Sequence, residues 1–417
     1  MHARPAAVLL PASTADIQEA VSFAAARGLR LVARGAGHST YGQSQAAGGI
    51  VVDMTTLAAV REVEPGHAVV AAGTLWSQVV DAARAAGQTP PVLTDYLATT
   101  VGGTLSVGGF GGASHRHGAQ TDNVTALEVV TGTGELTTCS ATENRDLFDS
   151  VRGGLGRFGV ITAATLRLTP AFDNTRWYKL WYDDLAVFLT DQSRLVAEAR
   201  CAHVQGRIVP AGNGSWRYRI ELAEHYDRPH PPDDHELLRG LRHTPGAEET
   251  EDLTHADFLD RMADGERRLR AAGDWFHPHP WLNLMLPSAT TESFVRRALG
   301  TLTGESLGRA GLVLVYPLPT RHLATPLVRR PAGATAFMVA LLRTARPGTQ
   351  HTSIAANRAL YGHALAAGAV AYPTNALPMS PEDWRRHYGP RWPDVVRAGR
   401  RFDPRGVLAP GHGTQAG

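Results

Sequence analysis

The chain has 417 residues, more than one hydrophobic core of roughly 100–200 residues accounts for, which predicts two or three domains. Hydrophobic residues make up 43%, charged residues 19%, and the net charge is +2. No apolar run approaches the roughly 18 residues of a membrane-spanning helix. The 39 acidic residues are interspersed with 41 basic ones, which leaves no basic tract for nucleic acid. The composition therefore excludes a membrane protein and argues against a nucleic-acid partner.

The two cysteines, Cys139 and Cys201, are too few for a disulfide framework or for a zinc site of their own. Residues 1–5 lack the long apolar stretch of a secretory signal. We therefore expect a reducing, cytoplasmic setting.

Helices and strands alternate in the first 170 residues. A helix is predicted from Asp16 to Gly28, because Ser13 and Asp16 approximate a capping box and a glycine ends the apolar periodicity. Strands are predicted at 29–33 and 49–54, and a second helix runs from Leu75 to Gly87.

Beyond about residue 169 the pattern changes to strands rich in aromatic residues. We predict a helix at 258–272 and a polar surface excursion at 227–254. Strands are predicted at 177–182, 216–220, 281–286 and 311–316. A second domain of roughly 200 residues, built from strands and helices, is the expected arrangement.

Three glycine clusters occur in the first domain, at 34–39, 99–112 and 153–161. Backbone amides in such turns can converge on phosphate oxygens, because glycine lets the main chain approach closely. The first cluster matches neither a Rossmann fingerprint nor a Walker loop, and by itself it favours a plain tight turn. The second has six glycines, more than a packed strand or helix tolerates without a reason. Together the clusters predict an extended dinucleotide.

These residues resemble the flavin-binding domain of the vanillyl-alcohol-oxidase/PCMH superfamily and, within it, the cytokinin dehydrogenases. The segment 35–43 resembles the flavin-attachment segment of that family, and 94–106 resembles its active-site and pyrophosphate loop. The motif from Pro278 to Leu284 and the C-terminal residues Trp384, His387, Trp392 and 408–411 are more specific. The resemblance covers the sequence from about Pro5 to Gly411.

The resemblance implies an α+β fold. A PCMH-type FAD-binding domain of two α/β subdomains spans 1–170, and a substrate-binding cap domain with an antiparallel sheet and flanking helices spans 171–370. The segment 371–417 returns to the FAD domain. It also implies FAD bound covalently through His38 as an 8α-histidyl flavin. A single bond is expected, because no cysteine lies between Thr89 and Gly118. The other flavin contacts that it implies are Ala33, Gly35, Gly37, Ser39, Gln43, Asp95, Thr100, Ser106, Phe110, Val160, Tyr372, Ala409 and His412.

Two carboxylates are candidate catalytic residues. Asp95 lies where the family has an acid beside the flavin, and a carboxylate there would accept the N–H proton of an amine substrate during hydride transfer. Its residue type alone favours a turn or N-cap. Glu266 matches one of two adjacent acids that precede the Pro-His-Pro-Trp motif, and Gly265 replaces the other. An exposed i,i+4 pair with Arg270 explains Glu266 about as well.

The histidine pairs 115/117 and 277/279 lack a third ligand at useful spacing, so no metal is expected. The stretch 321–335 departs from the family, because it is basic and small where cytokinin enzymes usually carry acids. This departure means that either the N6 substituent differs or the substrate is not an adenine cytokinin.

Three functions stay open. The first is oxidation of the C–N bond in the N6 substituent of an adenine cytokinin to an imine, which water hydrolyses to adenine and an aldehyde. The second is a bacterial secondary-metabolite flavin oxidase or dehydrogenase that acts on another amine or alcohol. The third, of another class, is a flavoprotein with a redox-neutral cyclase or ligand-binding role. The electron acceptor, oxygen or a quinone, and the oligomeric state are not predicted.

Overall fold

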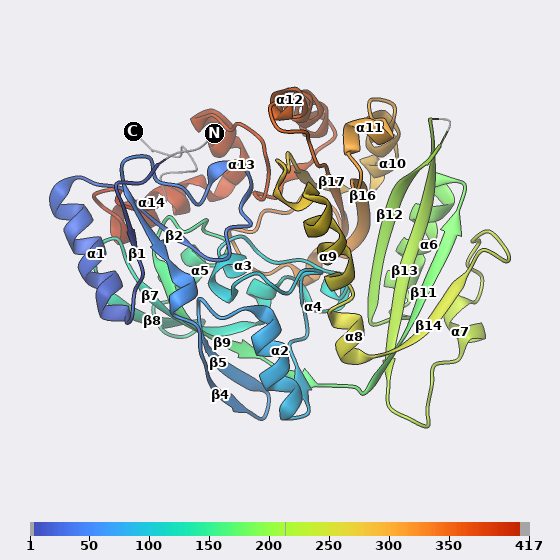
Figure 1. Ribbon diagram of the computed structural model, residues 1–417, viewed down its shortest axis with the longest axis horizontal. Helices are drawn as coiled ribbons and strands as arrows, with labels where there is room; N and C mark the ends of the chain where they lie inside the picture. Colours follow the sequence, from blue (N-terminus) through green and yellow to red (C-terminus); the bar gives the residue numbers. More distant parts are fainter. Residues whose placement is uncertain (1–3, 213, 409–417) are drawn as a thin grey trace.

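The computed structural model describes residues 4–212 and 214–408, and its helices and strands form two units around separate hydrophobic cores (Figure 1). We call these the first unit, whose core residues lie mainly within 17–168 and 384–408, and the second unit, whose core residues lie within 178–377. The α+β class is confirmed, because the structure combines mixed helices with largely antiparallel sheets.

Two sheets organise the first unit. A three-stranded parallel sheet has the order β1-β3-β2, and a five-stranded antiparallel sheet has the order β4-β5-β9-β7-β8. Their strands are Ala7–Leu9 (β1), Leu31–Arg34 (β2), Ile50–Asp53 (β3), Val60–Glu64 (β4), His67–Ala71 (β5), Val124–Val130 (β7), Leu136–Ser140 (β8) and Val160–Arg167 (β9). A short antiparallel pair, Gln88–Thr89 (β6) with Thr169–Pro170 (β10), lies where the chain enters the second unit.

The first helix forms as the sequence predicts. It spans Thr14–Arg27 (α1), with the Ser13–Asp16 capping box in place and Gly28 in the left-handed conformation at φ 64°. The other helices of this part are Trp76–Ala85 (α2), Val101–Leu105 (α3), Ser114–His117 (α4) and Arg145–Val151 (α5).

Part of the glycine-rich stretch is helical. The short helix α3 includes Gly102 and Gly103, and a close tertiary approach explains why glycine occurs there. A Cβ atom on Gly102 would lie 2.8 Å from the side chain of Ala72, and the Gly102 amide donates to the Ala72 carbonyl at 2.8 Å. The entropic cost of glycine in this helix is therefore offset by backbone packing on the end of β5.

An eight-stranded sheet forms the second unit, with the order β14-β11-β13-β12-β16-β17-β15-β18. Its strands are Asn174–Tyr182 (β11), His203–Gly212 (β12), Ser215–Tyr226 (β13), Glu249–Thr254 (β14), Leu282–Pro287 (β15), Leu312–Pro319 (β16), Thr335–Leu342 (β17) and Val370–Ala371 (β18). Its other helices are Leu185–Ala197 (α6), Asp234–Leu238 (α7), Ser288–Leu299 (α10), Gly304–Leu307 (α11) and Gln350–Ala366 (α12).

Two details of the second unit differ from the sequence prediction. The polar excursion 227–254 contains an edge strand, β14, which pairs with β11. Its alternating acidic residues lack the apolar pattern by which strands are recognised. The predicted helix 258–272 is split into His255–Leu259 (α8) and Ala263–Ala272 (α9). Both lie between the first unit and the large sheet (Figure 1).

The C-terminal helices Pro381–Tyr388 (α13) and Trp392–Phe402 (α14) pack on the first core. Leu31 donates its amide to Val407 at 2.8 Å, and it forms a parallel bridge with Leu408. The last described residues of the chain therefore pair with β2, and α14 packs against α5 of the first unit. Within the described residues, no helix is long and apolar enough to cross a membrane.

Candidate active site

The three glycine clusters meet in the structure. The first contacts the second at Gly35, where an added Cβ would lie 1.9 Å from the Thr100 hydroxyl oxygen. The third bonds to the second, because the Gly153 amide donates to Leu105 at 2.9 Å and the Leu155 amide donates to Ser106 at 2.8 Å. Clusters that are far apart in the sequence thus form one continuous surface.

The turn after β2 carries polar groups without protein partners. Among the described residues, no acceptor is bonded to the amides of Gly37, His38 and Ser39, and the buried Thr40 hydroxyl also has no partner. Gly37 is half-buried, and His38 and Ser39 are exposed, so these amides can reach a bound ligand. Amides that converge in a turn suit an anionic, oxygen-rich group such as the pyrophosphate of a dinucleotide.

His38 lies in an aromatic cluster. Its ring centroid is 4.9 Å from that of Tyr96 and 6.1 Å from that of Trp275, both in edge-on geometry. Desolvation by the surrounding protein lowers the pKa of His38, and the nearby Glu266 carboxylate opposes that shift. The neutral imidazole is therefore favoured, and its unprotonated nitrogen is the form that can act as a nucleophile.

Asp95 is held by a cation from the second unit. Its Oδ1 accepts from Nη2 of Arg261 at 2.5 Å, and Arg261 lies in the turn between α8 and α9. The Asp95 side chain is 20% exposed and that of Arg261 is 6% exposed. Among the described residues Oδ2 of Asp95 has no hydrogen-bond partner. One carboxylate oxygen is thus fixed and the other is left for a ligand.

Glu266 faces the site and also pairs along its own helix. Its Oε1 accepts from the Tyr96 hydroxyl at 3.0 Å and from Nε of Arg270 at 2.6 Å. The guanidinium of Arg270 lies 4.8 Å from the ring centroid of Trp275. Burial, followed by the bond to Glu266, raises the pKa of Tyr96 to about 12. Glu266 therefore makes both the helical pair with Arg270 and a contact with Tyr96, two roles that the sequence presents as alternatives.

A second aromatic group lies where the sheet of the second unit meets the second glycine cluster. Gly109 donates its amide to the Tyr372 hydroxyl at 3.1 Å, and the Tyr372 ring is 5.1 Å from that of Phe110. Tyr316 is buried on β16 in the same apolar cluster as Phe110. Burial raises its pKa well above the usual value, and the nearby Asp95 adds to the shift.

The remaining predicted contacts that the structure describes lie in the first unit, and Val160 among them is buried in its core. Ala33 lies on β2, Gln43 follows the short 3₁₀ helix Thr40–Gly42 (η1), and Val160 begins β9. The Ser106 hydroxyl donates to the Gly102 carbonyl at 2.7 Å, so its proton is already used. Ala409 and His412 lie outside the described residues.

Comparison with known proteins identifies the family. A profile described as "Cytokinin dehydrogenase 1, FAD and cytokinin binding" matches residues 202–414, and one described as "FAD binding domain" matches residues 5–140. An uncharacterized oxidoreductase, ORF5 in the fasciation locus of Rhodococcoides fascians, is 52% identical over 412 residues, covering 99% of this chain and 94% of that protein. Cytokinin dehydrogenase 5 of Oryza sativa subsp. japonica is 36% identical over 466 residues, covering 99% and 87%. Cytokinin dehydrogenase 2 of Arabidopsis thaliana is 33% identical over 441 residues, covering 98% and 88%.

This chain belongs to the cytokinin dehydrogenase family. It is an FAD-dependent oxidoreductase. The unpartnered amides of the 37–39 turn and the joined glycine clusters fit the phosphates of FAD. The neutral His38 imidazole fits a residue placed to hold the flavin ring.

In this cytokinin dehydrogenase family member, sequence reasoning missed Arg261, Trp275 and Tyr316. Arg261 and Trp275 lie on either side of α9, in a charged segment whose pattern is that of a solvated surface helix. Tyr316 is one residue of an apolar strand. The residues around Arg261 gave no sign of its role, because its partner Asp95 is 166 residues away in the sequence.

The basic stretch that departs from the family is used structurally. Nε of Arg329 donates to the His387 carbonyl at 3.3 Å, and Nη1 of Arg330 donates to the carbonyls of Thr320 and Leu323. The Thr325 hydroxyl and amide bond to Asp122 at 2.6 and 2.8 Å. These contacts tie the stretch to the first unit and to the C-terminal segment, so two of its arginines are used in packing.

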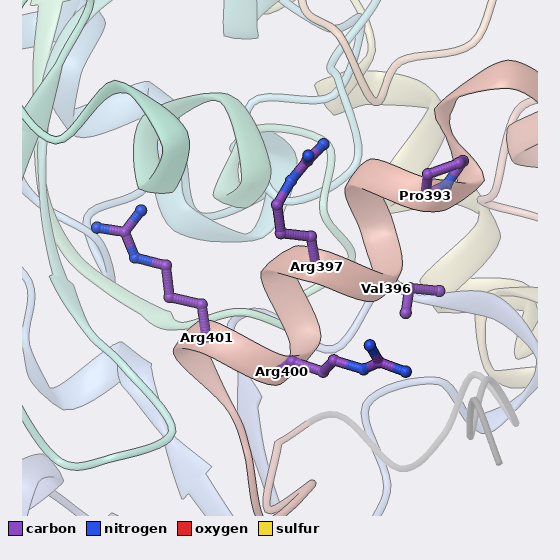
Figure 2. Close-up of a pocket in the computed structure, with 5 residues that line it drawn as sticks. All are labelled: Pro393, Val396, Arg397, Arg400 and Arg401. Atoms are coloured by element: carbon purple, nitrogen blue, oxygen red, sulfur yellow. The ribbon is translucent and has the colours of Figure 1, made fainter.

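Two hollows are found among the described residues. A cleft of about 170 Å³ between the units is lined by His203, His225, His255 and Phe258, and also by Thr94 and Arg261, so it borders the Asp95–Arg261 pair. A larger depression of about 650 Å³ is lined by Pro393, Val396, Arg397, Arg400 and Arg401, all on α14 (Figure 2). Arg397 and Arg401 pair with Asp394 and Asp146, and α14 carries none of the predicted site residues. Among the described residues no group of His, Cys, Asp or Glu is arranged to hold a metal ion.

Proposed function

We propose that this protein oxidises the C–N bond in the N6 substituent of an adenine cytokinin. The observation that carries the proposal is the Asp95 carboxylate, which presents one oxygen without a partner among the described residues and directly precedes Tyr96 in the sequence. A family relationship to cytokinin dehydrogenases over nearly the whole sequence supports the substrate class.

FAD, when bound, supplies the two-electron acceptor for the hydride that leaves the substrate carbon. The protein's own residues handle the proton and the geometry. Oδ2 of Asp95 accepts the hydrogen bond, and then the proton, of the substrate N–H as positive charge develops on that nitrogen. The substrate becomes an imine, and water hydrolyses it to adenine and an aldehyde.

We propose that His38 anchors the flavin through one covalent bond. A neutral imidazole nitrogen is required for that bond, and burial favours the neutral ring. The edge-on contacts with Tyr96 and Trp275 restrict the ring's orientation. Glu266 accepts a hydrogen bond from the Tyr96 hydroxyl and thereby fixes the Tyr96 ring. Tyr96 directly follows Asp95 in the sequence.

Anaerobic mixing of the holoprotein with isopentenyladenine tests the function. We expect the flavin absorbance to bleach rapidly, and adenine and an aldehyde to accumulate when an acceptor is supplied. Bleaching by other amines or alcohols alone would replace the substrate class with that of a secondary-metabolite oxidase. No bleaching by any donor would favour a redox-neutral or ligand-binding role.

A further inference from the structure

We propose that Arg261 is the positioning residue that orients Asp95 toward the substrate nitrogen. This inference rests on the proposed function, because it assigns a role within that reaction. It concerns a residue that does not itself touch the substrate: the guanidinium fixes one oxygen of the carboxylate, and the other oxygen does the chemistry.

The guanidinium is held on three sides. Nη2 donates to Asp95 Oδ1 at 2.5 Å, Nη1 donates to the Phe258 carbonyl at 3.1 Å, and the guanidinium carbon lies 4.6 Å from the centroid of the Phe258 ring. The side chain is only 6% exposed. A planar group fixed at two nitrogens and one face has little rotational freedom. The Asp95 carboxylate that it holds therefore has a defined direction.

The contact is single rather than bidentate, and this matters for the role. Arginine–carboxylate pairs are frequently bidentate, with both oxygens engaged. Here Oδ1 alone is engaged, and Oδ2 has no partner among the residues that the structure describes. An acceptor oxygen left open in this way is what a proton acceptor for a bound amine requires.

The two residues come from different units. Asp95 precedes the second glycine cluster of the first unit, whereas Arg261 lies at the break between α8 and α9 in the second. The break of the predicted helix at this point turns the arginine toward Asp95. Correct seating of the second unit on the first therefore sets the direction of the carboxylate.

The cleft between the units gives the experiment an entry route. Arg261 lines this cleft of about 170 Å³ together with His203 and Phe258, so truncation of its side chain would open a space that joins the cleft to Asp95. Guanidinium ion is small enough to enter and to replace the missing group. A merely structural role of Arg261 would not be restored by a freely diffusing ion.

The test compares holoproteins of wild type, Arg261→Ala, Arg261→Lys and the control Arg267→Ala, whose side chain is 70% exposed on α9. Flavin reduction by isopentenyladenine is followed anaerobically by stopped flow, with and without guanidinium chloride at a concentration well below that which unfolds the protein. Sodium chloride of equal ionic strength is the reference. We expect Arg261→Ala to reduce FAD about a hundredfold more slowly at saturating donor, which is the scale for a misplaced catalytic group.

Guanidinium should raise the flavin-reduction rate of Arg261→Ala at least about tenfold. The rate of Arg261→Lys should lie between those of wild type and Arg261→Ala. The donor's dissociation constant and the flavin spectrum should change little, and Arg267→Ala should match wild type. A reduction rate within about twofold of wild type in Arg261→Ala, or a slow rate that guanidinium does not raise, would overturn the role of Arg261. If Arg261→Ala loses FAD or fails to fold, the flavin-reduction rate of the Arg261→Lys holoprotein is compared with that of wild type by the same criterion. A wild type that no donor reduces would instead overturn the proposed function, and the role of Arg261 with it.

Discussion

Acid should destabilise the seam between the two units, because neutral histidines are buried there. Burial lowers the pKa of His225 to about 3 and that of His255 to about 4. Their rings lie 4.5 Å apart. Nδ1 of His255 is 3.3 Å from Nη1 of Arg84, which can only donate, so the imidazole nitrogen is the acceptor and must be unprotonated.

The sign of the effect follows from proton linkage. Unfolded histidine has a pKa near 6.5, so below that pH the unfolded protein binds more protons than the folded one. The contribution of the neutral His225 and His255 to the free energy of unfolding is therefore complete well above pH 6.5 and is lost as the pH falls toward 4. Between pH 7.5 and pH 5.0 the loss is about 2 kcal/mol for each of the two histidines.

The measurement is urea unfolding of wild type and His255→Gln at pH 7.5 and pH 5.0, followed by tryptophan fluorescence. Glutamine can still accept from Arg84 but does not titrate. We expect the advantage of wild type at pH 7.5 to shrink by about 2 kcal/mol at pH 5.0. His235→Gln, whose side chain is 85% exposed, should leave the pH dependence of wild type unchanged. An advantage that is equal at both pH values would refute the reasoning.

Four substitutions test other parts of the structure. His38→Ala should yield flavin that acid precipitation releases from the protein; flavin that stays covalently attached would show that another residue is the anchor. Asp95→Asn should retain FAD and be reduced at least about a hundredfold more slowly, within the range for a lost proton acceptor; an unchanged reduction rate would remove it from the reaction. Gly265→Ala should slow hydrogen exchange in α9 by stabilising the helix by about 0.5–1 kcal/mol, because a Cβ there meets no atom within 4 Å; faster exchange would contradict this. Asp403→Asn should cost about 1–3 kcal/mol in thermal unfolding, because its two oxygens accept from the amides of Val407 and Leu408 at 2.7 and 2.9 Å and an amide nitrogen cannot; an unchanged melting temperature would count against that account.

Local rules in the sequence were sufficient for several elements. The capping box at Ser13 and the glycine at position 28 define α1 at both ends, and the structure confirms them. The apolar runs that form β15 and β16 are strands for the same local reason. The family, and with it FAD, followed from residue motifs whose spacing survives in this protein.

The limits of prediction lie where partners are distant in the sequence. The helix α3 contains Gly102 because Ala72 is too close to admit a Cβ atom there, a fact that no local pattern contains. The strand β14 is recognisable only through its ladder with β11. Glu266 received two competing interpretations, and the structure shows one carboxylate that bonds both Arg270 and Tyr96.

The sequence alone determined the elements whose signals lie within a few residues and the cofactor class, and it named Asp95 as a candidate, because capping, periodicity and motif spacing are short-range properties. Only the tertiary structure decided which groups surround that acid. Arg261, Tyr316 and the His38–Tyr96–Trp275 cluster come from segments that are far apart in the sequence, and their proximity depends on how the large sheet seats on the first unit. The physical reason is that burial, ion pairing and the direction of a carboxylate are properties of packing, which a protein acquires only when its distant segments meet.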